Sequence, residues 1–289
     1  MTDYRYHLLD VFTQTKLAGN QLAVVPEAQG LDDRRMQMIA REFNLSETLF
    51  LFPPARPDAL FSVRIFTPGA EIGFAGHPTI GATVLLAHLG LLPVQDGRGR
   101  AVLDLAAGPV EVSIDQGTAS LVAPKPPVLA GVTNAAALTS AVGLTEQEVV
   151  GPGRLATAGT VFAFLQAASA ADVARVIPDH AAIARLMPSP ATGLTVYARS
   201  GPDSFDVRMF APQEGVFEDP ATGSSAAAMA ALLLADDASC AGRTFLLRQG
   251  VAMGRPSEIH LQPFLRDDGT PAARVSGQAV IVGEGTLFL

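Results

Sequence analysis

A segment of the first half of the chain returns in the second half, and no other feature of the sequence limits the fold as strongly. Residues 63–68 read VRIFTP, and 144 positions later the chain reads VRMFAP. A Pro-x-x-Gly stretch follows each copy and opens an apolar run. The matching segments are 63–68 with 207–212, 78–81 with 220–223 and, more weakly, 18–23 with 158–163. Because these matches keep the same order at similar offsets, the sequence predicts an internal duplication with two similar halves.

The sequence of each half predicts a sheet wrapped around one helix. The runs that follow the two Pro-x-x-Gly stretches, residues 82–92 and 224–235, are apolar on almost all sides, which indicates buried helices. Both helices are expected to open at their proline, Pro78 and Pro220, because the first helical turn tolerates a missing N–H. Short runs typical of strands precede the first of these helices, at 22–25, 48–52 and 63–66. The expected fold class is therefore α+β.

The boundary between the halves is predicted near residues 121–127, where three prolines cluster. The end of the chain, residues 278–287, reads as a strand, a turn and a second strand that return to the first half. The predicted domains are residues 1–121 with 276–289, and residues 122–275. An amphipathic helix is expected over residues 32–43, where apolar residues recur at helical spacing.

Composition narrows the classes of function. The formal net charge is −8, which argues against non-specific nucleic-acid binding, since that needs Lys and Arg to neutralise phosphates. A single cysteine, Cys240, excludes an internal disulfide and any zinc site that needs two thiolates. The N-terminus lacks the apolar core of a signal peptide, and Gly and Pro interrupt the longest uncharged stretch. A soluble, cytoplasmic protein without a membrane segment is expected.

Generic catalytic motifs are missing from the sequence. It contains no phosphate-binding loop, no Gly-x-Gly-x-x-Gly and no Gly-x-Ser-x-Gly. The five histidines show no metal-ligand spacing. The sequence therefore gives no support to a metal, a nucleotide cofactor or an acyl-enzyme mechanism.

Three polar residues in apolar or Gly-rich settings remain as candidates for chemistry. Glu47 opens the apolar stretch 47–52, where it is either a cap of the preceding turn or a functional acid. His77 directly precedes the first buried helix, and Asp219 is assigned the matching place in the second half. Asp219 as an N-cap and His77 as a turn residue are the structural alternatives. The functional alternative is a pair of helix N-termini that face one cleft and bind an anionic substrate.

Several stretches of the chain together resemble the phenazine biosynthesis PhzF family, from about residue 6 to the last strand pair. The shared segments are 10–13 (DVFT), 19–24 (GNQLAV), 36–48 (ending in NLSET), 64–68 (RIFTP), 74–79 (FAGHPT) and 219–225 (DPATGSS). The resemblance implies a diaminopimelate-epimerase-like fold, in which each of two similar domains is a barrel-like sheet around a central helix. It also implies a homodimer, no cofactor, and isomerisation of a small carboxylate-bearing substrate similar to trans-2,3-dihydro-3-hydroxyanthranilate.

The resemblance also implies roles for individual residues. The proton-moving glutamate of the family falls on Glu47, and its substrate-holding histidine and aspartate fall on His77 and Asp219. The remaining substrate-contacting positions fall on Ser46, Gly76, Gly223 and Ser224. The N-terminal domain would thus carry Glu47 and His77, and the C-terminal domain Asp219 and Ser224. If the cleft is largely apolar, loss of hydration should raise the pKa of Glu47 toward the working pH.

The chain departs from the family pattern at two places beside the site. Gln21 stands where the family commonly has Pro, and Gly73 precedes Phe74 where a bulkier residue is common. Both departures concern the wall of the site, so they affect the identity of the substrate more than the chemistry.

Two other functions are compatible with the same fold. An epimerase or racemase of a small amino acid uses an acid or base on each side of a stereocentre, two cysteines in the related epimerases. Cys240 is the only cysteine and follows the second buried helix, and no acid occurs at 194–197, the stretch matched to Glu47. A proton shift by a single carboxylate therefore fits better. A non-catalytic protein that binds a small ligand in the same cleft would show binding without turnover.

Overall fold

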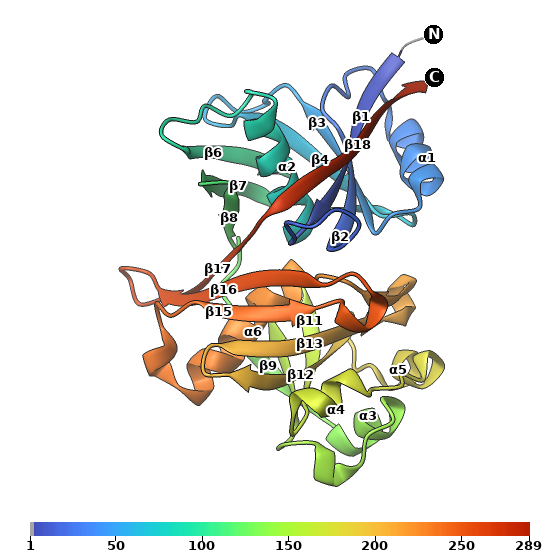
Figure 1. Cartoon of the computed structure of the whole chain (residues 1–289), viewed down its shortest axis with the longest axis vertical. Helices are drawn as coiled ribbons and strands as arrows, with labels where there is room; N and C mark the ends of the chain where they lie inside the picture. The colour runs from blue at the N-terminus through green and yellow to red at the C-terminus, as the bar shows by residue number, and fades with distance from the viewer. Residues whose placement is uncertain (1–2) are drawn as a thin grey trace. The chain divides into compact units, whose positions relative to one another are not determined.

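The computed structural model describes residues 3–289, and the chain forms two compact units. Unit 1 runs to Pro124 and also includes Ser276–Leu289, and unit 2 is the continuous segment Lys125–Val275 (Figure 1).

Unit 1 is a largely antiparallel sheet that is completed by the last strand of the chain. β18 pairs antiparallel with β1, which pairs antiparallel with β2 (Figure 1). From β2 the pairing continues parallel to β3, antiparallel to β4, parallel to β6 and antiparallel to β7 and β8. The strands are β1 (Asp3–Val11), β2 (Asn20–Val25), β3 (Glu47–Phe52), β4 (Phe61–Phe66), β5 (Glu71–Ile72), β6 (Arg98–Leu105), β7 (Gly108–Asp115), β8 (Thr118–Val122) and β18 (Ala279–Phe288).

The central helix of unit 1, α2 (Gly76–His88), is buried along most of its length. Because the helix is apolar on all sides, its stable position is against the sheet and away from water. Gly81 lets it approach closely, since a Cβ there would lie 2.5 Å from Leu22 Cδ2 and 2.8 Å from Val11 Cγ2. The second turn of α2 is thus held against β1 and β2, the strands that begin the unit.

The predicted amphipathic helix is confirmed as α1 (Asp33–Phe43). The Asp32 side chain accepts a hydrogen bond from the Arg35 N–H at 2.7 Å and caps the N-terminus. Met36, Ile39 and Ala40 are buried in a cluster that also contains Phe50 of β3 and Phe66 of β4. Side chains alternate across a strand, so Phe50 faces α1 while odd-numbered residues of β3 face the other side of the sheet.

Unit 2 repeats this order of strand pairing. β9 pairs antiparallel with β10 and β10 with β11; β11 runs parallel to β12, β12 antiparallel to β13, β13 parallel to β15 and β15 antiparallel to β16. The strands are β9 (Val128–Thr133), β10 (Gly153–Thr157), β11 (Val161–Gln166), β12 (Gly193–Gly201), β13 (Ser204–Ala211), β14 (Val216–Asp219), β15 (Phe245–Gln249), β16 (Ser257–Leu265) and β17 (Pro271–Gly277). The same sequence of parallel and antiparallel pairs runs from β18 to β7 in unit 1. The duplication of the chain itself stays a prediction.

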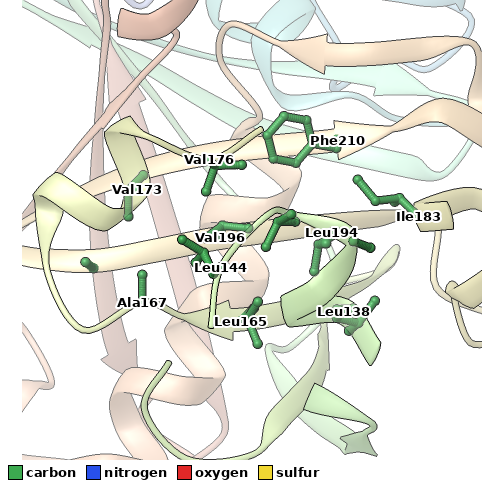
Figure 2. Packing of buried hydrophobic residues seen from close by; sticks show 14 of the residues in the cluster. Leu138, Leu144, Leu165, Ala167, Val173, Val176, Ile183, Leu194, Val196 and Phe210 are labelled. Carbon is green, nitrogen blue, oxygen red and sulfur yellow. The ribbon is translucent and has the colours of Figure 1, made fainter. Parts of the chain in front are cut away.

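Helices cover both faces of the sheet in unit 2. On one face, α3 (Ala135–Ala141), α4 (Ala170–Ala174) and α5 (His180–Leu186) enclose a core with Leu194 and Val196 of β12 (Figure 2). On the other face lies α6 (Gly223–Asp236), an apolar helix that is buried along most of its length. Thr195, between Leu194 and Val196, forms a buried hydrogen bond of 2.6 Å with Ser225 of α6. Successive side chains of β12 therefore point to opposite faces of the sheet, Leu194 and Val196 toward α3, α4 and α5, and Thr195 toward α6.

The two central helices do not begin where their prolines predicted. α2 begins at Gly76, so Pro78 is its third residue, whereas α6 begins at Gly223, three residues after Pro220. Pro220 lies in the connection between β14 and α6, where its missing N–H is equally harmless. The Pro-x-x-Gly stretches are therefore alike in sequence but differ in their position relative to the helices.

The predicted turn within residues 278–287 is wrong, because β18 is one continuous strand. Its glycines accommodate the neighbouring strand instead of turning the chain: a Cβ on Gly285 would lie 2.5 Å from the Tyr6 hydroxyl oxygen. A register shift between Leu8 and Leu9 of β1 absorbs an extra residue of β18. Among residues 3–289, no helix is both long and apolar enough to span a membrane.

Thr48→Val is expected to stabilise the protein by about 1 kcal/mol, because it removes a buried polar group that makes no hydrogen bond. Thr48 is fully buried in β3, and its hydroxyl oxygen has no hydrogen-bond partner within residues 3–289. Urea unfolding of the two proteins measures the difference. Thr195→Val is the matched control and should destabilise, since it deprives Ser225 of its partner. Loss of stability in both variants would contradict the prediction.

Candidate active site

Glu47 owes its position to the way α1 ends. Asn44 adopts the left-handed conformation, with φ of 50°, and its N–H bonds the Ala40 carbonyl, which terminates the helix. Three residues later β3 begins at Glu47, which pairs in register with Leu22 of the parallel strand β2. Glu47 is thus the first residue of a strand, on the face of the sheet opposite to Phe50 and α1.

The structure brings His77 to Glu47. His77 is the second residue of α2 and is 4% exposed. Its Nδ1 lies 3.2 Å from Glu47 Oε2, and the Glu47 side chain is 17% exposed. Its Nε2 lies 3.3 Å from the carbonyl oxygen of Gln21. The imidazole therefore lies between a carboxyl group and a backbone carbonyl.

These contacts fix the protonation of His77. A carbonyl oxygen can only accept a hydrogen bond, so Nε2 carries the hydrogen and donates it to Gln21. Burial lowers the pKa of His77 to about 3, against the weaker opposing effect of the Gln21 hydrogen bond. The ring is neutral at neutral pH, and Nδ1 presents a lone pair toward Glu47. Because Nδ1 of the neutral ring can only accept, this contact is a hydrogen bond when Glu47 Oε2 carries a proton.

Gly76 and Ser46 complete the predicted residues of unit 1. Gly76 is buried and is the first residue of α2, and Ser46 is half-buried in the turn before β3. Ala75 occupies the N-cap position and provides no side-chain cap for the first turn of α2. Backbone N–H groups at such a helix end are suited to an anion such as a carboxylate.

In unit 2, Asp219 ends β14 and is 8% exposed. Its Oδ2 accepts a hydrogen bond of 2.6 Å from the Thr222 hydroxyl, and its backbone carbonyl accepts one of 2.7 Å from Gln249 Nε2. Gln249 also donates to Thr222 Oγ1 at 2.9 Å and accepts from the Thr222 N–H at 3.2 Å. A buried amide side chain at the end of β15 therefore holds the whole turn from Asp219 to Thr222.

Gly223 and Ser224 are the first two residues of α6, and Thr222 is its N-cap residue, without a side-chain cap to the helix. The N-cap alternative for Asp219 is therefore wrong. The predicted equivalence of His77 and Asp219 is also wrong, since His77 lies within its helix and Asp219 lies four residues before Gly223. The structure assigns the two residues to different units and different local settings.

Thr222 and Gln249 were missed as site residues. Thr222 was visible within the DPATGSS stretch, but nothing in the sequence indicated a bond between its hydroxyl and Asp219. Gln249 carried a weak signal, as a polar residue at the end of the apolar stretch 245–247 and directly before a glycine.

Strand register identifies the position in unit 2 that corresponds to Glu47. Glu47 pairs with Leu22 in unit 1, and Gly193 pairs with Phe162 in unit 2. A Cβ on Gly193 would lie 2.9 Å from Met209 Sδ, so a side chain there would clash. Unit 2 therefore has no acid at this position, and the counterpart of Glu47 lies one residue before the stretch compared in the sequence.

Residues 3–289 contain no group of three or more His, Cys, Asp or Glu side chains placed to hold a metal ion.

Comparison with known proteins gives matches over nearly the whole chain. The family of phenazine biosynthesis-like proteins, PhzC-PhzF, matches residues 9–285. An uncharacterised isomerase of Mesorhizobium japonicum is 38% identical over the full length of both chains. Trans-2,3-dihydro-3-hydroxyanthranilate isomerase of Pseudomonas aeruginosa is 31% identical, over 99% of this chain and 100% of that protein.

Solved structures confirm the predicted fold class. A phenazine biosynthesis protein of the PhzF family from Bacillus anthracis has a TM-score of 0.89 at 19% identity, and both chains are covered completely. A probable proline racemase from Agrobacterium radiobacter has a TM-score of 0.72 at 16% identity, over 99% of this chain and 93% of that one. The α+β fold with a central helix in each unit is thus the fold shared by PhzF proteins and by racemases of the epimerase-like type.

Proposed function

From the premise that this chain belongs to the phenazine biosynthesis-like PhzC-PhzF family and is an isomerase, we propose that it moves a proton between two carbons of a small carboxylate-bearing substrate, with Glu47 as general acid and base. The observation that carries this proposal is the contact of 3.2 Å between Glu47 Oε2 and His77 Nδ1 at the start of α2.

The contact supports a carboxyl group that both takes and returns a proton. In the first step the Glu47 carboxylate removes a proton from a C–H group of the substrate, and the electron pair of that bond is delocalised over the adjoining π system. In the second step Glu47 returns the proton to another carbon of that system, so no net proton or electron is gained. When Glu47 carries the proton taken from the substrate, it can donate a hydrogen bond to the Nδ1 lone pair of neutral His77, whose Nε2 donates to Gln21. One positioned group with both roles is sufficient for such a shift.

Within unit 1 the substrate carboxylate is proposed to bind at the N-terminus of α2, whose first turn has no side-chain cap and where Gly76 offers an N–H group. Within unit 2 the proposed substrate-holding residues are Gly223 and Ser224, in the uncapped first turn of α6, and Asp219 before it. The hydroxyl of Thr222 donates a hydrogen bond to Asp219 Oδ2 and so fixes the orientation of the Asp219 carboxylate.

A proton shift is favoured over racemisation by the identity of Gly193. A two-base racemase needs a second acid or base, and the position that corresponds to Glu47 in strand register is Gly193, which carries neither. A single carboxylate can remove and deliver a proton on one face of the substrate, which is the stereochemistry of an isomerisation.

The proposed substrate class is a dihydro-hydroxyanthranilate or a similar cyclic carboxylate. The name of the Pseudomonas aeruginosa relative supports it. The test is incubation of the protein with trans-2,3-dihydro-3-hydroxyanthranilate in deuterated water, followed by NMR. Consumption of the compound with a new C–H bond at the carbon that receives the proton is the expected result, and deuterium there marks the turnovers in which the proton on Glu47 exchanges with solvent before it is returned. Deuterium at a stereocentre that is inverted but otherwise unchanged would indicate an epimerase. Absence of both, for this compound and for a panel of cyclic and amino-acid-like carboxylates, would overturn the proposal.

The proposed oligomer is a homodimer, and strand β9 supports it. The side chains of Val128, Leu129 and Val132 in this strand are 48%, 47% and 72% exposed. Several exposed apolar side chains on one strand are typical of a surface that another protein covers. Sedimentation of the wild type and of Val132→Lys tests this proposal. The wild type should have the mass of two chains, and the variant should dissociate into single chains at a higher protein concentration than the wild type. A wild-type protein with the mass of one chain would contradict the dimer.

A further inference from the structure

The repeated Arg-x-Phe motif forms the same ion pair in both units. In unit 1, Arg64 donates to Glu71 through Nε at 2.7 Å and Nη2 at 2.5 Å. In unit 2, Arg208 donates to Glu218 through Nε and Nη2, both at 2.8 Å. In each unit the guanidinium carbon also lies 5.2 Å from the centre of the phenylalanine ring two residues later. The proposed chemistry uses neither pair.

Each ion pair holds the short strand that leads into a central helix. Glu71 lies in β5, where the next residue, Ile72, pairs with Ile65. Glu218 lies in β14, where the next residue, Asp219, pairs with Met209. From Ile72 to Gly76 and from Asp219 to Gly223 the chain advances by the same number of residues before its helix begins. The glutamate therefore anchors the same point of the connection in both units.

In unit 2 this anchor lies directly beside Asp219. Between the pairs Met209–Asp219 and Ala211–Val216 the register of β13 and β14 shifts, so that Phe217 and Glu218 together oppose Phe210. A bulge of this type changes the direction of the side chain that follows it. The direction of Asp219 therefore depends on how Glu218 is held. Glu218 is held by a guanidinium that is fixed in turn by the Val176 carbonyl at 2.7 Å.

The burial of this pair indicates a geometric role. The side chains of Arg208 and Glu218 are 10% and 14% exposed. Removing two charges from water costs several kcal/mol, which their attraction offsets only when the geometry is good, so such pairs contribute little net stability. A planar guanidinium that binds both carboxylate oxygens does, however, fix position and direction.

We propose that Arg208 and Glu218 are positioning residues for Asp219, with Gln249 as the second support on its backbone carbonyl, and that Arg64 and Glu71 are the counterpart for the strand that leads to His77. The inference rests on the proposed function for the role of Asp219 in substrate binding. The ion pair holds the residue before Asp219, and Gln249 and Thr222 hold Asp219 itself, so its carboxylate has one orientation when the substrate arrives.

The test compares Glu218→Gln with Asp236→Asn in the full-length protein. Both variants keep the size of the side chain and remove one charge from a bidentate arginine pair in unit 2, since Asp236 binds Arg154 at 2.6 and 2.9 Å. Asp236 lies at the last turn of α6, away from its first residue. Hydrogen–deuterium exchange of the peptide that covers 216–223 is the first measurement, and turnover of trans-2,3-dihydro-3-hydroxyanthranilate is the second.

Glu218→Gln is expected to accelerate exchange in 216–223 by roughly tenfold, and to lower kcat/KM by about tenfold through loss of substrate orientation. Asp236→Asn should change neither quantity, because Asp236 lies at the far end of α6 from residues 216–223. Arg208→Lys, which keeps the charge but loses the planar fork, should behave like Glu218→Gln.

Unchanged exchange in Glu218→Gln, or equal acceleration in Asp236→Asn, would overturn the positioning role. Faster exchange with unchanged turnover would also overturn it, because the orientation of Asp219 would then have no consequence for the substrate. If the wild type leaves this compound unchanged, the proposed substrate fails, and the exchange experiment still decides whether the ion pair holds Asp219.

Discussion

Glu47→Gln is expected to lower turnover by at least about two orders of magnitude, the usual size of a lost general acid–base contribution. Glutamine keeps the length and shape of the side chain and still forms hydrogen bonds, but its amide cannot accept a proton from carbon. Affinity for the substrate should therefore change much less than turnover. Steady-state kinetics with trans-2,3-dihydro-3-hydroxyanthranilate give the turnover, and calorimetric titration of the inactive variant gives the affinity.

Glu42→Gln is a suitable control for this experiment, since Glu42 lies exposed on α1, near Glu47 in the sequence. It removes the same charge without affecting the site, and its turnover should equal that of the wild type. Undiminished turnover in Glu47→Gln would mean that the base is another residue, and the mechanism would have to be abandoned.

His77→Asn is expected to slow turnover by about tenfold or more and to alter how stability depends on pH. Unfolded His77 binds a proton near its ordinary value of 6.5, whereas burial lowers the pKa of folded His77 to about 3. Between these values the unfolded chain binds more protons than the folded chain. The wild type should therefore lose stability as the pH falls below 6.5, by up to about 1.4 kcal/mol per pH unit from this residue alone.

The variant lacks this group, so its stability should fall less steeply over the same range. Urea unfolding of both proteins at pH 7, 6 and 5 measures the two slopes. His88→Gln provides the matched control, because His88 is exposed at the opposite end of α2 and should leave the wild-type slope in place. Equal slopes for the wild type and His77→Asn would show that His77 is protonated in the folded protein.

Much of the fold could be predicted because its signals are local. The helix at α1 carries its cap, its periodic apolar face and its terminating Asn44 within one continuous stretch. The central helices were recognisable because sequences without a polar face have no stable place at a surface. The helix start predicted at Pro220 was wrong, since proline is tolerated both in a first helical turn and in the extended connection before a helix.

The site was less accessible because its bonds join residues that are distant in the chain. Glu47 and His77 were both selected, but their mutual contact depends on the register of β2 and β3 and on the position of α2. Gln249 reaches Thr222 and Asp219 across a similar distance in sequence. No local pattern encodes such bonds. The turn predicted at the glycines of β18 was wrong for the same reason. The role of Gly285 depends on its contact with Tyr6, which is distant in the sequence.

The pairing of the first strand with the last has a consequence for how the protein is made. Asp3 pairs with Phe288, so β1 leaves the ribosome before the whole of unit 2 and waits for its neighbour until β18 has been synthesised. Unit 2 is an uninterrupted stretch and can acquire its structure while the chain is still growing. Unit 1 is then completed only after unit 2 has been synthesised. The same adjacency makes the chain suitable for circular permutation, in which a short linker joins β18 to β1 and new ends are opened in an exposed loop.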